Sequence, residues 1–405
     1  MQLEHKNTLS ADLSHVLFVY RAMIPTIYCI HLLFDHLAKA KKIEYKCIQE
    51  MKLRNSDLEW ADIIYLGRFD SWYEQKLAER MKAAGDRTVY YIDDDLPNVP
   101  QEIKCSDYYG RADIKKHIRA CIELSGAILT PSPILLQKYT TVQRPGILFQ
   151  SAAFLPGTYT PHQEAETIKI GFAGSLDRSN DLDAMLSQTL KQVKAKYKER
   201  ISLQFYGAIP SFAKEVDAVC IPYEANYLKY RQKLNELNWD IGLAPMPDTP
   251  FHACKHYNKF IEYGSSAIAG IYSDVSPYLS IPQRETVGRF CKNTPEAWME
   301  AICTEIEDNA AREAHREMAW DICLQQFSLD HVTEKLLEAQ EECLSKGSNQ
   351  KIKLRRLPLI GIKLANIWFR GSGFIKQNRF KTIQMIPRIM GEKLQGEKAK
   401  KELGA

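Results

Sequence analysis

The chain has 405 residues, of which 45% are apolar and 26% are charged, and its formal net charge is +4. This length suggests two or three domains. The composition is ordinary for a folded protein, which excludes disorder of the whole chain. No run of about 18 apolar residues occurs, which excludes a polytopic membrane protein.

The charge is distributed unevenly along the chain. Residues 350–405 hold 14 Lys and Arg against 3 Asp and Glu, a net +11, whereas the remaining 40 basic and 47 acidic residues give −7. Leu, Ile, Trp and Phe alternate with the cations, and Gly and Pro interrupt any long helix. The pattern predicts that residues 350–405, in a basic amphipathic tail over residues 346–405, bind an anionic membrane surface. A disordered, solvated tail is the alternative, and nucleic acid is not expected because the rest of the chain is acidic.

The ten cysteines are scattered and form no Cys-x-x-Cys pair, so a structural zinc site is not expected. The N-terminal segment is polar and lacks a signal pattern. These features predict a cytoplasmic protein with reduced thiols. The basic tail adds peripheral association with the inner face of the membrane.

From residue 15 onward, short segments rich in β-branched and aromatic residues alternate with longer segments of helical periodicity. Such alternation is typical of a parallel sheet covered by helices. Two prolines and a glycine in residues 154–166 predict a linker. Up to that linker we expect strands at residues 15–20, 45–48, 62–66, 87–92 and 126–130, and helices at residues 27–40, 71–84, 111–124 and 131–139.

The alternation resumes after the linker. It predicts strands at residues 167–172, 201–205, 218–221, 239–243 and 267–272, and helices at residues 181–196, 227–237, 255–263, 294–308, 310–327 and 329–344. We therefore expect an α/β protein with two Rossmann-like domains facing a cleft. The predicted boundaries are 1–160 and 161–345, followed by the tail. In open α/β sheets ligands bind beyond the carboxyl ends of the strands, so the loops after strands are the candidate sites.

The first candidate loop begins at Gly174 and Ser175, between a strand and a helix. Glycine allows a backbone to approach a phosphate, and the N-terminus of the following helix offers free N–H groups. Arg178 would add a charge-assisted contact. The alternative is a plain turn in which Asn180 or Asp181 caps the helix.

The second candidate loop contains Lys255 and Lys259, four residues apart and expected on one face of a helix. Two cations near a helix N-terminus oppose the helix dipole, which is favourable only if an anion binds there. The alternative is that both lysines extend into water, with Lys259 and Glu262 as a surface pair.

The third candidate loop contains Asp93, Asp94 and Asp95 at the end of a strand. Neighbouring carboxylates raise one another's pKa. They would bind a metal, orient a sugar hydroxyl or act as a base, and the alternative is a capped turn in water.

Several segments together resemble the bacterial GT-B glycosyltransferases, the group 1 or family-4-like set of surface polysaccharide biosynthesis. The resemblance covers roughly residues 13–340 and rests on order and spacing. The segments read ADIIYLGRFD, VYYIDDDLPNVP, IKIGFAGSLDRSNDLDAML and WDIGLAPMPDTPFHACKHYNKFIEYG.

The resemblance implies that the C-terminal domain binds a nucleotide-sugar donor. Gly174 and Ser175 would line the diphosphate loop, and Glu262 would hold the ribose hydroxyls. The cations near the phosphates would be Arg178, Lys255 and Lys259. The family's first glutamate falls at Cys254, where this chain departs from the pattern, and Asp181 stands where a lysine is common.

The implied reaction transfers a sugar from the nucleotide sugar to a lipid-linked or polysaccharide acceptor. Asp93 or Asp94 would orient or deprotonate the acceptor hydroxyl. No metal or other cofactor is expected, because positioned cations and helix N-termini would stabilise the leaving diphosphate. Two alternatives stay open: a catalytically silent scaffold of a polysaccharide assembly complex, and a nucleotide-dependent epimerase or phosphorylase of the same fold.

Overall fold

A computed structural model describes residues 14–82, 88–103, 105–161, 166–344 and 362–363. The chain divides into two units, residues 1–353 and residues 354–405. The predicted membrane-binding segment therefore lies almost wholly outside the described residues. The predicted domain boundaries at residues 160 and 345 stay a prediction.

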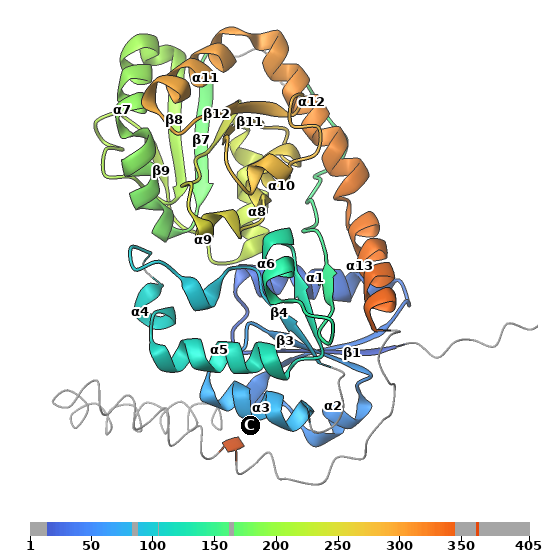
Figure 1. Ribbon diagram of the computed structural model, residues 1–405. Helices are drawn as coiled ribbons and strands as arrows, with labels where there is room; N and C mark the ends of the chain where they lie inside the picture. The colour runs from blue at the N-terminus through green and yellow to red at the C-terminus, as the bar shows by residue number, and fades with distance from the viewer. Residues whose placement is uncertain (1–13, 83–87, 104, 162–165, 345–361, 364–405) are drawn as a thin grey trace, which may run out of the picture. The chain divides into compact units, whose positions relative to one another are not determined.

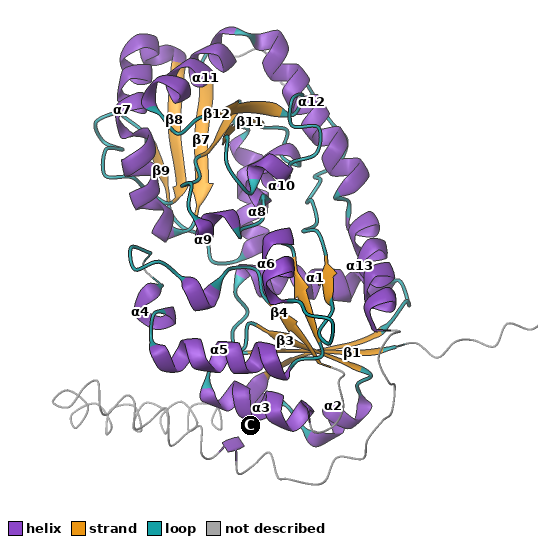
Figure 2. Cartoon of the chain, viewed as in Figure 1, coloured by secondary structure: helices purple, strands orange, loops and turns teal. Residues whose placement is uncertain are grey.

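Two six-stranded parallel sheets organise the first unit, and helical segments follow most of the strands and cover the sheets (Figures 1 and 2). The strand order is β2-β1-β3-β4-β5-β6 in the first sheet and β12-β11-β10-β7-β8-β9 in the second. The α/β class and the pair of Rossmann-like domains are confirmed. The strands are β1 (His15–Tyr20), β2 (Glu44–Gln49), β3 (Ile63–Gly67), β4 (Thr88–Tyr91), β5 (Ala127–Thr130), β6 (Gly146–Leu148), β7 (Ile168–Gly174), β8 (Ile201–Gly207), β9 (Val219–Ile221), β10 (Ile241–Ala244), β11 (Ala269–Ser273) and β12 (Gly288–Cys291).

Helices cover both faces of each sheet, as parallel sheets require. On the first sheet α1 packs with α13, while α3 packs with α5 (Figure 1). On the second sheet α7 packs with α11, while α10 packs with α12. The α-helices are α1 (Pro25–Lys39), α2 (Asn55–Trp60), α3 (Trp72–Lys82), α4 (Ser106–Tyr109), α5 (Ala112–Leu124), α6 (Pro133–Tyr139), α7 (Ser179–Tyr197), α8 (Tyr227–Leu237), α9 (Pro250–Ala253), α10 (Asn258–Gly264), α11 (Pro295–Glu307), α12 (Asn309–Gln326) and α13 (Leu329–Leu344).

The apolar residues whose spacing predicts a helix over residues 27–40 form the buried face of α1. The buried positions of α1 are Ile27, Ile30, Leu33, Phe34 and Leu37, one stripe of an amphipathic helix. This stripe joins one hydrophobic cluster with β1 and with α13. The last helix described in this unit, α13, therefore packs against the domain that begins the chain.

One predicted helix is wrong in its extent. The sequence predicts a helix over residues 255–263, but the chain forms two short helices, α9 and α10, with a bend between them. Pro250 starts α9 early, and the Thr249 side chain caps it by accepting from the His252 amide at 3.2 Å. At the bend, His256 lies within 2.8 Å of both Gln150 Oε1 and Asn258 Oδ1.

The two edge strands β6 and β12 were not predicted from the sequence. They have three and four residues. Among the described residues, no helix is long and apolar enough to cross a membrane.

Candidate active site

The second sheet has its topological switch point between β7 and β10, since the chain passes from β7 outward to β9 and returns beside β7. Ligands of such sheets bind at this point, beyond the carboxyl ends of the strands. Arg178 spans it: Nη2 donates to the Pro245 carbonyl, which follows β10, at 2.6 Å. Its Nε lies 3.1 Å from the Asp181 carboxylate. The predicted cation of the first loop is thus fixed at the switch point.

The predicted phosphate loop, Gly174 and Ser175, lies where β7 and β8 end side by side. Gly207 follows with φ of +83°, and a Cβ there would come within 2.2 Å of the Gly174 carbonyl oxygen. Only glycine fits this close approach. The alternative in which Asn180 or Asp181 caps the helix is wrong, because α7 already begins at Ser179.

Three further strand ends are tied together beside this loop. The Met246 amide, after β10, donates to Ser273 Oγ at the end of β11 at 2.8 Å. Ser273 Oγ in turn donates to Asn293 Oδ1 after β12 at 2.6 Å, and Asn293 returns a bond to the Met246 carbonyl at 2.9 Å. This closed network holds the loop after β10 rigidly next to Arg178.

Lys259 and Glu262 form an ion pair, but it does not lie on the surface. Their side chains are 20% and 10% exposed, and Tyr230 of α8 donates to the same Glu262 oxygen at 2.9 Å. Burial alone would raise the pKa of Glu262, yet the charges of Lys259 and Arg231 lower it. Burial lowers the pKa of Lys259 despite its partner. Glu262 is therefore an ionised, buried acceptor of hydrogen bonds.

Lys255 does not share a helical face with Lys259, which corrects the prediction. It lies in the bend between α9 and α10, and its Nζ is 2.8 Å from Asp94 Oδ1. Asp94 belongs to the loop after β4, 161 residues earlier. The loops after strands of the two sheets thus meet at this ion pair.

Arg68, which sequence reasoning missed, holds the two predicted carboxylates of the N-terminal domain. Its Nε lies 3.0 Å from Asp93 Oδ1 and its Nη2 lies 3.1 Å from Asp94 Oδ2. Arg68 follows β3 with φ of +53°, a left-handed conformation that non-glycine residues adopt mainly where the surrounding structure requires it. The signal in the sequence is a charged residue directly after a buried strand.

The environments of Asp93 and Asp94 push their pKa values apart. Burial raises the pKa of Asp93, and the charge of Asp94 adds to this against the opposing effect of Arg68. For Asp94, burial is outweighed by Lys255 and Arg68, which lower its pKa to about 2. Pairs of groups separated in this way are typical of acid–base sites. The ionised form is therefore favoured more strongly at Asp94 than at Asp93.

Asp95 turns away from the other two carboxylates. It accepts from Lys138 at 2.5 Å, from Tyr139 and from Asn98, all within the N-terminal domain. The run of three carboxylates is thus divided between two sets of partners. No group of three or more His, Cys, Asp or Glu arranged to hold a metal ion occurs among the residues whose placement is described.

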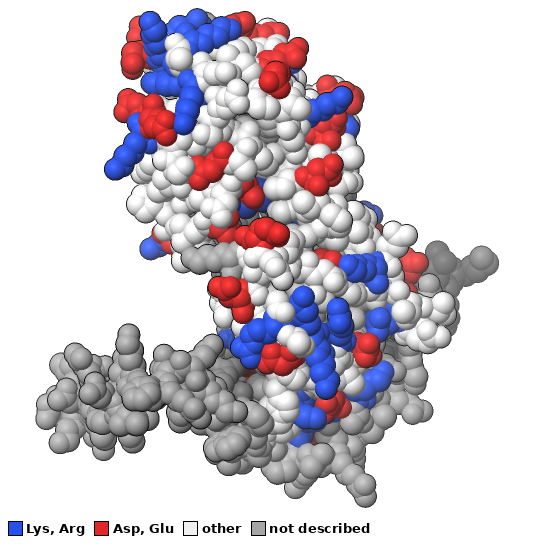
Figure 3. All heavy atoms as spheres, turned by 60° about the vertical axis from the view of Figure 1, so that its left-hand side comes forward, with Lys and Arg blue, Asp and Glu red and all other residues white. Residues whose placement is uncertain are grey.

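A second charged group, also missed from the sequence, lies at the switch point of the first sheet, between β1 and β3. Arg21, which follows β1, forms two hydrogen bonds with the Asp70 carboxylate. The Tyr108 hydroxyl lies 3.0 Å from Arg21 and donates to Asp70 at 2.9 Å. Burial raises the pKa of Asp70 to about 7. On the face in Figure 3, basic side chains gather over the part with this sheet, with acidic ones among them.

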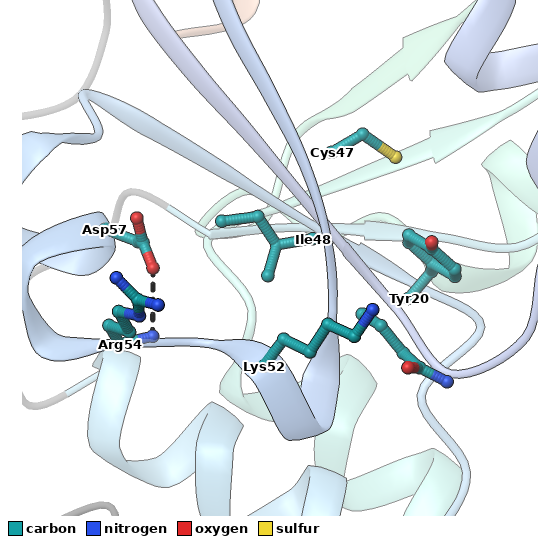
Figure 4. A pocket seen from close by; sticks show the side chains of 7 residues that line it. Tyr20, Cys47, Ile48, Lys52, Arg54 and Asp57 are labelled. Atoms are coloured by element: carbon teal, nitrogen blue, oxygen red, sulfur yellow. Dashed lines mark hydrogen bonds between the residues drawn. The ribbon is translucent and has the colours of Figure 1, made fainter. Parts of the chain in front are cut away.

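A cavity of about 300 Å³ opens beside the edge strand β2 (Figure 4). It contains none of the predicted site residues and is separate from the meeting point of the two sheets. Its lining residues are Tyr20, Cys47, Ile48, Gln49, Lys52, Arg54 and Asp57.

The pKa of His252, near the end of α9, is lowered in part by the positive charges of the site. It is 6% exposed, and its Nδ1 lies 2.7 Å from Thr249 Oγ1. Burial, together with the charges of Lys255 and Arg178, lowers the pKa of His252 to about 4. His252 is therefore neutral at physiological pH. The positive charges of Lys255 and Arg178, which belong to two different loops, both act on its imidazole ring.

This environment predicts how stability depends on pH. An unfolded histidine titrates near pH 6.5, so between about pH 4 and 6.5 the unfolded chain binds the proton that folded His252 does not. His252 should therefore make the melting temperature rise more steeply with pH across this interval, and this contribution should level off above it. In a His252→Gln protein the rise should be smaller. A His331→Gln protein, altered on α13, serves as the control, and equal profiles for wild type and His252→Gln would contradict the argument.

No protein-family model matches the chain, and no curated protein does. Solved structures do match. HepE of Anabaena, in complex with UDP and glucose, is 12% identical with a TM-score of 0.56, covering 81% of this chain and 100% of HepE. A glycosyltransferase of Rickettsia africae is 13% identical with a TM-score of 0.53, covering 83% and 100%. Sucrose-phosphate synthase of Thermosynechococcus elongatus is 10% identical with a TM-score of 0.57, covering 82% and 99%. The chain therefore has the two-domain GT-B fold that is characteristic of glycosyltransferases.

Proposed function

We propose that the protein is a glycosyltransferase that moves a sugar from a nucleotide-sugar donor to an acceptor hydroxyl. The observation that carries this proposal is the ion pair between Lys255 and Asp94. It brings a carboxylate of one Rossmann-like domain against the cation-bearing loops of the other, at the carboxyl ends of both sheets. Anabaena HepE, of the same fold, has been solved with UDP-glucose, so UDP sugars are the first donors to test.

The C-terminal domain would bind the donor. The diphosphate would lie over Gly174 and Ser175, just before α7, whose N-terminus has no capping side chain. Arg178, Lys255 and Lys259 would stabilise the charge that develops on the leaving nucleoside diphosphate. Glu262, ionised and held by Tyr230 and Lys259, would accept hydrogen bonds from the ribose hydroxyls.

The N-terminal domain would present the acceptor. The bond between the sugar anomeric carbon and the diphosphate oxygen breaks, and a bond to the acceptor oxygen forms. The acceptor hydroxyl proton passes to a carboxylate, Asp93 or Asp94. Arg21 and Asp70, at the switch point of the first sheet, would hold polar groups of the acceptor.

The acceptor is proposed to be lipid-linked or a growing polysaccharide. The support is the composition of residues 350–405, which combines net charge +11 with interleaved apolar side chains. Attraction of such a segment to anionic lipid would bring the site to an acceptor in the membrane. The enzyme would then act at the inner face of the membrane.

A catalytically silent scaffold is the second candidate, and Cys254 is the observation that favours it. Cys254 stands at the position where the resemblance places a glutamate. It is buried, its thiol donates to the Pro250 carbonyl, and burial raises its pKa to about 11. A neutral thiol cannot replace a carboxylate in holding a sugar. Formation of glycosylated product from a panel of nucleotide sugars, with thermal stabilisation by the true donor, separates the two candidates.

Glu262→Gln should weaken nucleotide binding. The substitution keeps the shape and a hydrogen-bonding side chain beside Tyr230 but removes the charge. Losing a charged hydrogen bond costs about 1.5–3 kcal/mol, roughly a 10–150-fold increase in Kd. Calorimetric titration with UDP and with the other nucleoside diphosphates measures the effect.

Glu236→Gln is the matched control. Glu236 pairs with Lys233 at the same i,i+3 spacing, but both side chains are about half exposed. Its loss should leave nucleotide affinity unchanged. Equal affinities for wild type and Glu262→Gln, with both proteins folded, would remove Glu262 from the donor site.

Transfer should not require a divalent metal ion, because Arg178, Lys255 and Lys259 would supply the positive charge at the diphosphate. Activity should therefore be the same in excess EDTA as in Mg²⁺ or Mn²⁺. Activity lost in EDTA and restored by either ion would instead assign a metal-binding role to the carboxylates of residues 93–95.

Truncation after Lys346 should abolish membrane binding without affecting the donor site. Each Lys or Arg near an anionic surface contributes roughly 1 kcal/mol at low salt. Full-length protein should co-sediment with vesicles containing phosphatidylserine or phosphatidylglycerol, and high salt should release it. The truncated protein should stay in the supernatant yet bind nucleotide normally. Failure of full-length protein to bind such vesicles at low salt would refute the membrane role.

A further inference from the structure

Lys255 differs from Arg178 and Lys259 in the domain to which its ion-pair partner belongs. Arg178 is fixed by Pro245 and Asp181, and Lys259 by Glu262 and Tyr230, all within the C-terminal domain. Lys255 instead pairs with a carboxylate of the N-terminal domain, at 2.8 Å from Asp94. Its partner would be part of the acceptor site.

The position of Lys255 allows it to leave that partner. It lies in the bend between α9 and α10, its side chain is 25% exposed, and its Nζ is 4.9 Å from the centre of the Phe251 ring. A long side chain on a bend reaches a new partner by rotamer changes alone. No regular element has to move.

Asp94 also tolerates the loss of Lys255. Its second oxygen accepts from Arg68 Nη2 at 3.1 Å, and Arg68 is in turn anchored beside Asp93. Removing one partner from a buried charge is costly chiefly when no other partner remains. Here one remains, so the carboxylate stays paired and ionised while an oxygen is freed.

The charge of Lys255 already acts on the phosphate loop. It lowers the pKa of His252, as Arg178 does, and it opposes the effect of burial on Asp181 in the first turn of α7. A diphosphate at this loop would carry more negative charge than the single carboxylate of Asp94. The ammonium group would therefore favour the diphosphate when both are within reach.

We propose that Lys255 is exchanged between Asp94 and the donor diphosphate. In the empty site Lys255 forms an ion pair with Asp94. When the donor binds, the Lys255 ammonium group moves to the diphosphate, and one oxygen of Asp94 is free to accept a hydrogen bond from the acceptor hydroxyl. This inference rests on the proposed function and adds an order to it, since the donor must bind before the carboxylate becomes available. It also places Asp94 as a competitor of the donor for the same cation.

The competition gives an unusual expectation: removing the charge of Asp94 should strengthen nucleotide binding. Calorimetric titration of D94N with UDP, other nucleoside diphosphates and inorganic pyrophosphate should show affinity at least about fivefold above wild type, the lower end of typical coupling between sites. K255Q should bind more weakly than wild type. In D94N/K255Q the gain should vanish, because the gain depends on Lys255.

D95N is the matched control. It removes a charge from the same loop, but Asp95 pairs with Lys138 and not with Lys255, so affinity should stay at the wild-type level. An equal gain in D95N, or a gain that persists in D94N/K255Q, would show a general effect of charge and overturn the exchange. If D94N does not fold, as judged by circular dichroism, D94A takes its place.

The outcomes also separate this inference from the function on which it rests. If wild type binds a nucleoside diphosphate and folded D94N binds it no more tightly, the exchange is wrong and the donor site stands. If neither protein binds any of these anions, the proposed function fails and the exchange fails with it.

Discussion

The burial of charged side chains where the two sheets meet is the constraint on which the structure depends. Arg68 and Asp93 are nearly buried, and neither charge is tolerable without a partner. Asp94 pairs with Arg68 of its own domain and with Lys255 of the other. The ion pair between Lys255 and Asp94 therefore links the two Rossmann-like domains through residues of the site itself.

Sheet topology explains why these charges converge. Parallel strands place all their carboxyl ends at one edge, and the reversal of strand order opens a crevice there. In the second sheet that crevice is spanned by Arg178, and in the first by Arg21 with Asp70. The packed helices behind each sheet hold these loops in place, and α13 fastens the end of the unit to α1.

Much of the fold follows from local patterns. The observed bounds equal the predicted ones for the strand over residues 15–20 and for the helices over residues 227–237 and 329–344. In such segments the period of the apolar residues indicates both the type of element and its buried face. The bend between α9 and α10 was not predicted. The helical spacing of apolar residues continues across the bend. His256, at the bend, contacts the neighbouring Asn258 and also Gln150, which is distant in the sequence.

The sequence already shows which chemical groups occupy the loops that follow the strands, namely glycine, cations and neighbouring carboxylates. Only the tertiary structure decided their partners. Lys255 looked equivalent to Lys259 along the chain, yet one meets Asp94 and the other Glu262. Arg68 became visible only through the carboxylates it holds. The physical reason is that the partner and the ionisation state of a charged side chain depend on burial and on distant neighbours, which for Lys255 and Asp94 are 161 residues apart. Local sequence spacing contains neither kind of information.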